Sequence, residues 1–239
     1  SSHICAVQVA LEISQQLLKA VKSKQDYSSL VESLSVFPQQ ELFAQLNDDN
    51  SKKAFWLNSY NAFNIILLKD NPSVLLNRIS RKKHFTKKAI TIAGNVLSLD
   101  DIEHGMIRNS KIWWSKGYLN KPFVSNFEKQ LRVDELDPRI HFALNCGAES
   151  CPAVRFYYPQ QLDQQLNVAT ASFLETEAQY CSKSQILNLS KLFNWYSGDF
   201  GGGRGVLNFL ADYGIIEKDS APQIKYRDYS WQPMVGTFE

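Results

Sequence analysis

The chain has little of several residue types that mark specialised protein classes. Its 239 residues include four cysteines and two methionines. No apolar run approaches the roughly 20 residues that a membrane-spanning helix needs. The strongest run, residues 62–68, contains an asparagine and stops at Lys69-Asp70. We therefore expect neither membrane insertion nor a disulfide-rich scaffold.

An excess of charge of one sign is also missing. The chain has 26 Lys and Arg against 24 Asp and Glu, a formal net charge of +2, so we expect no nucleic-acid partner. One basic cluster, residues 78–88, is interpreted as a solvated loop in preference to an anion- or partner-binding patch. The first residues lack the basic start and apolar core of a signal peptide. The sequence also begins without Met, so a removed leader, and with it a periplasmic or secreted location, stays open.

Residue periodicity predicts an α+β fold. Apolar spacing favours helices over residues 7–23, 30–37, 54–68, 102–108, 160–179 and 204–213. Alternation predicts a hairpin over residues 85–97 and short strands over residues 139–144, 186–189 and 224–231. The three glycines at 201–203 lack the lysine of a phosphate loop and indicate a connector. We expect a helical extension (residues 1–50) packed on a small, mostly antiparallel sheet of a domain formed by residues 51–239.

The segment Asp137–Pro152, DPRIHFALNCGAESCP, carries the strongest signal for chemistry. It places His141, Cys146 and Cys151 in one predicted strand-and-turn unit, with Cys146 at the strand end, where reactive groups are displayed. A thiolate nucleophile needs a base or a positive field, and amide donors for an oxyanion. Gly147-Ala148 offer such backbone N–H groups. Cys146 is therefore the predicted nucleophile.

Two histidines compete as the base. His141 and Cys146 are an odd number of residues apart, so on a regular strand they would face opposite sides, which favours His104. Glu103 precedes His104 on a predicted helix, about 100° away. It would orient His104 poorly, and it can pair instead with His141 or Arg139. The choice of base stays open.

Further polar residues are candidates for support. Asn58, Asn61 and Asn64 share one helix face, which predicts a network of buried amides, with a direct site role as the alternative. Asn145, beside the predicted nucleophile, is another candidate for polar support. Arg139 could bind a substrate carboxylate, although pairing with Asp137 or Glu103 is favoured.

Three other residues received structural interpretations. We expect Trp113-Trp114 in the core or at a lobe interface, with a cleft wall that stacks a substrate as the alternative. Asp199 is predicted to cap the turn that follows it, with a place in the site as the alternative. Cys5 and Cys181 could pair in an oxidising compartment.

Several segments resemble, in order, the family known as domain of unknown function 547. They are Ala54–Ala62, Leu99–Gly105, Asp137–Ala148, Ser150–Pro152, Leu189–Tyr196 with Asp199-Phe200, and Tyr229–Trp231. The resemblance implies a cysteine-hydrolase-like domain related to papain or transglutaminase folds, whose site is a Cys, a His and an acid. These roles map onto Cys146, His104 or His141, and Glu103. No histidine follows Cys146 in the chain, so a papain-like site would need a permuted element order.

The sequence thus predicts a cysteine-dependent hydrolase or acyl transferase. Its substrate would be a peptide or another amide, with no cofactor. One alternative is a non-catalytic binding or scaffold domain. Another is a zinc site formed by Cys146, Cys151, His141 and His104. A redox role is disfavoured, because the four-residue spacer exceeds the two residues of thioredoxin-like sites. The oligomeric state is not predicted.

Overall fold

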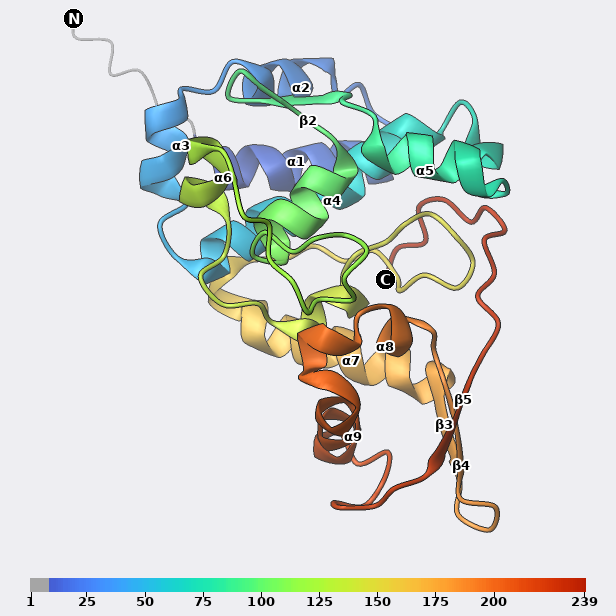
Figure 1. Cartoon of the computed structure of the whole chain (residues 1–239). Coiled ribbons are helices and arrows are strands. Elements are labelled where there is room, and N and C mark those ends of the chain that lie inside the picture. Colours follow the sequence, from blue (N-terminus) through green and yellow to red (C-terminus); the bar gives the residue numbers. More distant parts are fainter. Residues whose placement is uncertain (1–8) are drawn as a thin grey trace, which may run out of the picture.

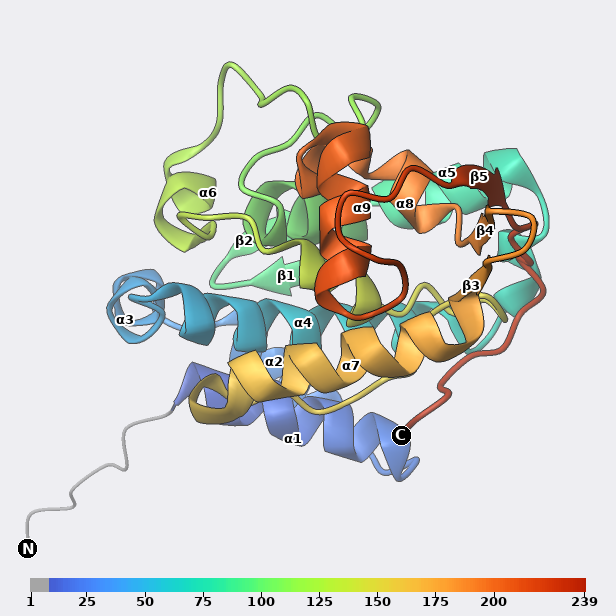
Figure 2. The same ribbon diagram turned by 90° about the horizontal axis from the view of Figure 1, so that it is seen from below.

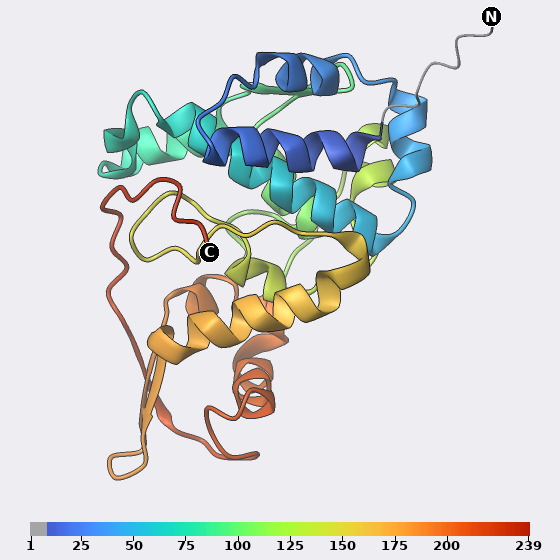
Figure 3. The ribbon, with the colours of Figure 1, turned by 180° about the vertical axis from the view of Figure 1, so that it is seen from behind.

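The computed structural model describes residues 9–239, and its first half is built on one long central helix. This helix, α4 (Asp49–Leu68), begins where the Asp48 side chain accepts the backbone N–H of Ser51. The three helices before it are α1 (Ala10–Lys22), α2 (Ser28–Ser35) and α3 (Gln39–Gln45). α1 runs alongside α4 (Figures 1 and 3). Leu17 and Leu18 of α1 share a core with Phe55 and Trp56 of α4, so the predicted helical character of this half is confirmed.

The predicted hairpin forms from β1 (Ile90–Ile92) and β2 (Asn95–Leu97), joined by Ala93-Gly94. The end of α2 packs on this hairpin, because the N–H of Ala93 donates to Leu34 O. The basic cluster before it is wrongly predicted as a loop and is helix α5 (Arg78–Thr86). The Asn77 side chain caps its first turn by accepting the N–H groups of Ile79 and Ser80, and Lys and Arg are good helix formers.

The predicted strand over residues 139–144 is also wrong. Pro138–Phe142 is a 3-10 helix, η3, in which Pro138 occupies the first turn and Asp137 caps the N-terminus by accepting the N–H of Arg139. Asp-Pro is a helix-start pair, and this local signal outweighs a short apolar run. The neighbouring elements are η1 (Pro72–Leu75), the π-helix η2 (Asp101–Ile107) and α6 (Asn126–Leu131).

The last third forms a second layer around α7 (Figure 2). Its elements are η4 (Pro159–Gln161), α7 (Leu162–Glu177), β3 (Ala178–Cys181), β4 (Ile186–Leu189), α8 (Leu192–Trp195), η5 (Ser197–Phe200), α9 (Gly202–Asp212) and β5 (Gln223–Tyr226). β3 and β4 are antiparallel, and β5 joins β4 in parallel. The described fold is therefore a mixed α+β fold with small, mostly antiparallel sheets, as predicted. The glycines at 201–203 open α9.

The two layers have separate hydrophobic cores, and η3 belongs to both. Ile140 is buried in the core around α1 and α4, whereas Phe142 is buried in the core around α7, α8 and α9. The chain that follows η3 runs between these cores, and the C-terminal segment returns along it through bridges from Ala148 to Pro233 and from Val154 to Phe238. The cysteine segment therefore lies where the two layers meet.

Candidate functional site

Three asparagines of α4 hold the cysteine segment in place. The Asn61 amide donates to Ala143 O at 3.0 Å and accepts the N–H of Asn145 at 2.9 Å. Asn58 clamps Tyr157 in the same two-way manner, at 2.9 and 3.0 Å. Asn64 donates to the carbonyl oxygen of Asn145 at 3.0 Å. The predicted amide network is confirmed. Its hydrogen-bond partners are backbone groups that precede Cys146 and follow Cys151 in the chain.

Asn145 and Gly147 shape the turn between the cysteines. The Asn145 side chain donates to Pro152 O at 2.6 Å and accepts the N–H of Gly147 at 2.9 Å. Gly147 has a φ of +91°, and a β-carbon there would collide with Leu68. Only glycine fits this position without strain. The turn is thus fixed by its own side chain as well as by α4.

Cys146 and Cys151 form a disulfide. Both are partly exposed and pack against Leu68 and Leu75. The N–H of Cys146 donates to Cys151 Sγ at 3.3 Å, and the Tyr229 hydroxyl lies 3.1 Å from Cys151 Sγ and 3.4 Å from Cys146 Sγ. In this structure Cys146 is thus paired and not the free thiol that the sequence led us to expect.

Tyr229 belongs to an aromatic wall beside the sulfurs. Its ring centroid lies 4.9 Å from the rings of Trp195 and Trp231, and the Arg81 guanidinium lies 4.0 Å from the Trp231 centroid. Burial, aided by the negative charge of Glu103, raises the pKa of Tyr229, so its hydroxyl keeps its proton at neutral pH. The sequence analysis gave Tyr229 no role, although the Tyr-Ser-Trp motif at 229–231 was a signal that could have identified it.

A second cluster is centred on Asp199, a residue wrongly predicted to cap a turn. Its carboxylate, fully buried, accepts from Arg108 Nε at 2.7 Å and Nη2 at 2.9 Å and from His141 Nε2 at 2.6 Å. Burial alone would raise the pKa of Asp199, but these hydrogen bonds lower it to about 2. Burial lowers the pKa of His141 although Asp199 opposes this effect. The His141 ring stacks on Tyr196 at 4.0 Å.

His104 is held by the same arginine. Arg108 Nη1 lies 2.8 Å from His104 Nδ1; a guanidinium only donates, so Nδ1 accepts and the ring proton is on Nε2, 3.6 Å from Asp100 Oδ1. Glu103 Oε2 accepts from the Tyr196 hydroxyl at 3.2 Å and lies 3.3 Å from His104 Nδ1. The expected pairing of Glu103 with His141 or Arg139 is wrong. Within residues 9–239, neither imidazole hydrogen-bonds to a cysteine sulfur.

Two other predicted residues lie away from both clusters. Arg139 pairs with Asp137 at 2.7 Å, as predicted, and with Asp163 at 2.9 Å, and so ties η3 to α7. Trp113 and Trp114 are 57% and 60% exposed, so their predicted place in the core is wrong.

A zinc site does not form from the predicted ligands. In the described part of the chain, no three His, Cys, Asp or Glu side chains are placed to hold a metal ion together. Cys5 lies outside the described residues, so its pairing with the exposed Cys181 stays a prediction.

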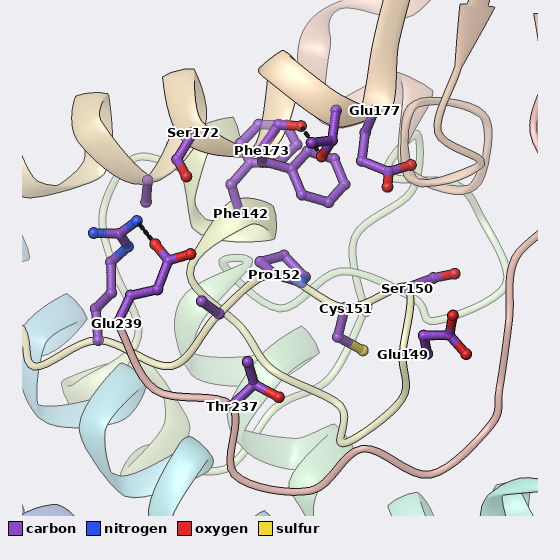
Figure 4. Close-up of a pocket in the computed structure, with 14 residues that line it drawn as sticks. Phe142, Glu149, Ser150, Cys151, Pro152, Ser172, Phe173, Glu177, Thr237 and Glu239 are labelled. Atoms are coloured by element: carbon purple, nitrogen blue, oxygen red, sulfur yellow. Dashed lines mark hydrogen bonds and ion pairs between the residues drawn. The ribbon is translucent and has the colours of Figure 1, made fainter.

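Cys151 lines a pocket of about 200 Å³ between α7 and the cysteine segment. Figure 4 shows its side chain on the wall that faces Phe142 and Phe173, with Glu149 and Ser150 beside it. Cys146 is not one of the lining residues. A ligand in this pocket would therefore contact Cys151 and not Cys146.

The fold and the site together define an α+β domain with a cysteine pair at the junction of its two layers. Residues 43–174 match the family described as "Protein of unknown function, DUF547", and because the match covers more than half of the chain, the chain belongs to this family. The match includes both cysteines and ends before Trp195, Asp199 and Tyr229. No curated protein and no solved structure matches the chain.

Proposed function

We propose that this domain carries out thiol–disulfide exchange at the Cys146–Cys151 pair. One observation carries the proposal: the two sulfurs are bonded to each other and lie within 3.4 Å of the Tyr229 hydroxyl, and Cys151 lines an open pocket. Exchange needs a thiolate that is stabilised and reachable. The site offers both features.

Cys151 is the sulfur suited to form the mixed disulfide. In the reduced pair it would receive hydrogen bonds from the N–H of Cys146 and from the Tyr229 hydroxyl, whereas Cys146 Sγ would receive only the longer one from Tyr229. Hydrogen bonds to the charged form lower the pKa of a thiol. The proposal therefore assigns the substrate-facing role to Cys151 and the resolving role to Cys146.

The substrate of the proposed exchange is a peptide or protein dithiol, which the Cys146–Cys151 disulfide oxidises. One substrate thiolate attacks Cys151 Sγ, the Cys146–Cys151 bond breaks, and the electron pair leaves on Cys146 Sγ, which takes up a proton. The second substrate thiolate then attacks its own mixed-disulfide sulfur, and the electron pair leaves on Cys151 Sγ. The substrate is oxidised to a disulfide and the pair is reduced to two thiols; the reverse sequence reduces a substrate disulfide.

A cysteine-dependent hydrolase or acyl transferase, with Cys146 as nucleophile, is the second candidate. The buried His141–Asp199 pair favours it, since an acid that orients an imidazole is the arrangement such enzymes use. However, in the described residues neither imidazole hydrogen-bonds to Cys146 Sγ: His141 donates from Nε2 to Asp199, and His104 Nδ1 accepts from Arg108. This candidate requires a reduced Cys146 and a base that moves to it.

Alkylation of the reduced protein separates the two functions. In a background with Cys5 and Cys181 replaced by Ser, we expect iodoacetamide to modify Cys151 first and at lower pH than Cys146, as read by mass spectrometry. In the reducing direction, Cys146→Ser should trap a mixed disulfide when the Cys151 thiolate attacks the disulfide of an oxidised peptide and one peptide thiol leaves, and Cys151→Ser should not. Tyr229→Phe should raise the pKa of the Cys151 thiol, with Tyr226→Phe as the matched control.

Two results would overturn the exchange proposal. A reduction potential below about −300 mV, with loss of folding on reduction, would make the pair a structural crosslink. Amide hydrolysis that is abolished by Cys146→Ser but unaffected by Cys151→Ser would instead establish the hydrolase.

A further inference from the structure

Exposed apolar side chains of the described residues are concentrated in one loop. Of the fourteen large hydrophobic side chains that are exposed in the described part of the chain, five lie within residues 113–123. Phe123 is 91% exposed, Trp114 60% and Tyr118 59%. Such a concentration marks an interaction surface, since isolated exposed apolar residues are ordinary but contiguous groups are not.

The same region is strongly basic, although the whole chain is nearly neutral. Residues 71–99 and 104–127 contain ten of the 26 Lys and Arg residues and none of the 24 Asp and Glu residues. The four residues between these two segments include three acids, Asp100, Asp101 and Glu103, of which Asp101 pairs with Lys88. From the sequence, the basic cluster at residues 78–88 was interpreted as a solvated loop in preference to an anion- or partner-binding patch, and the lysines of residues 111–121 were not considered.

The two basic segments meet on one face. Lys82 of α5 lies over the ring of Trp113, and Lys88 lines a pocket together with Lys111 and Trp113. A second pocket joins Lys88 to Phe123. Figure 2 shows α5 and the chain that leads into α6 on the side of the molecule opposite α1. We call this face, formed by α5 and residues 111–123, the basic aromatic face.

We propose that the basic aromatic face binds the surface of an anionic lipid membrane. Trp, Tyr and Phe favour the boundary between headgroups and acyl chains, and Lys favours anionic headgroups. The loop exposes Trp114 and Phe123 to solvent, and residues 111–123 contain three lysines and no acid. A flat, charged lipid surface matches this chemistry, and no described helix is long and apolar enough to cross a membrane.

Vesicle co-sedimentation tests the proposal. The full chain should bind vesicles of phosphatidylcholine mixed with phosphatidylglycerol, release them at high salt, and ignore phosphatidylcholine alone. Reversing Lys82, Lys83 and Lys87 to Glu should weaken binding at least about tenfold. The matched reversal of the exposed Lys183, Lys218 and Lys225 should weaken it less.

Replacing Trp113, Trp114 and Phe123 by Ala should also weaken binding, while circular dichroism shows an unchanged fold. The control is the Ala replacement of the exposed Val36, Val168 and Met234. Absence of vesicle binding at low salt, or equal binding to both vesicle types, would overturn the proposal. So would duplex DNA binding that outcompetes the vesicles and survives the aromatic replacements.

Discussion

The replacement Asp199→Asn tests whether the buried ion cluster is a structural element. It removes the counter-charge of Arg108, whose side chain is fully buried with that of Asp199. Breaking a buried pair by removing one partner costs about 3–5 kcal/mol. The lowering of the pKa of Asp199 from 3.8 to about 2 gives a second, smaller value: the ionised carboxylate stabilises the folded chain by about 2 kcal/mol. We therefore expect a loss of about 3 kcal/mol at pH 7.

Urea unfolding at several pH values gives the measurement. Because the pKa of Asp199 is lower in the folded than in the unfolded chain, its stabilisation is complete above about pH 4. It is lost as the pH falls through 2. The difference between wild type and Asp199→Asn should therefore shrink in strong acid. The double variant Asp199→Asn with Arg108→Met should recover at least about 1 kcal/mol of the loss, since it leaves no unpaired buried charge.

A loss below about 0.5 kcal/mol, the range of ordinary surface substitutions, would refute this account of the cluster. A difference that does not change between pH 7 and pH 2 would refute the part assigned to ionisation.

Three further predictions concern the frame of the cysteine turn. Gly147→Ala should destabilise by about 2–3 kcal/mol, because of its positive φ and the collision with Leu68. Gly94 also has a positive φ, but a β-carbon there would meet open space, so Gly94→Ala should destabilise by only about 1 kcal/mol. Equal shifts in melting temperature for the two glycine variants would contradict this. Asn61→Ala leaves two buried backbone groups without partners and should cost about 2–4 kcal/mol in urea unfolding, whereas the exposed Asn208→Ala should change little. His84 supports this frame because its Nε2 lies 2.7 Å from Asn64 Oδ1. Burial lowers the pKa of His84 to about 4, so native stability should decline as the pH falls from about 6.5 toward 4. His84→Gln, measured by the same unfolding assay, should reduce that decline.

The sequence predicted best where a local pattern and its physical requirement agree. The helix over residues 54–68 has the apolar period and the Asp48 cap, and its buried amides had to find partners. The prediction failed for residues 139–144, because a short apolar run fits a strand and a buried 3-10 helix equally well. Only the Asp-Pro pair distinguishes the two.

The site was harder to predict because its contacts are distant in sequence. Asp199 reaches Arg108 across 91 residues and His141 across 58, and no periodicity encodes such pairings. Tyr229 is 83 residues from Cys146. The Cys-x4-Cys spacing gave no indication that the two sulfurs would meet, because the turn that joins them depends on the Asn145 side chain and on Gly147.

The distribution of hydrogen-bonding capacity argues for sulfur chemistry over proton transfer. In the described residues neither imidazole of the ion cluster hydrogen-bonds to a cysteine sulfur: His141 Nε2 donates to Asp199, and His104 Nδ1 accepts from Arg108. The basic nitrogen that remains is Nδ1 of His141, and it makes no hydrogen bond to Cys146 or Cys151. The Tyr229 hydroxyl, by contrast, contacts both sulfurs, and burial with the charge of Glu103 keeps it protonated. A group that donates to sulfur and does not readily ionise stabilises a departing thiolate during exchange and cannot serve as the base that hydrolysis requires.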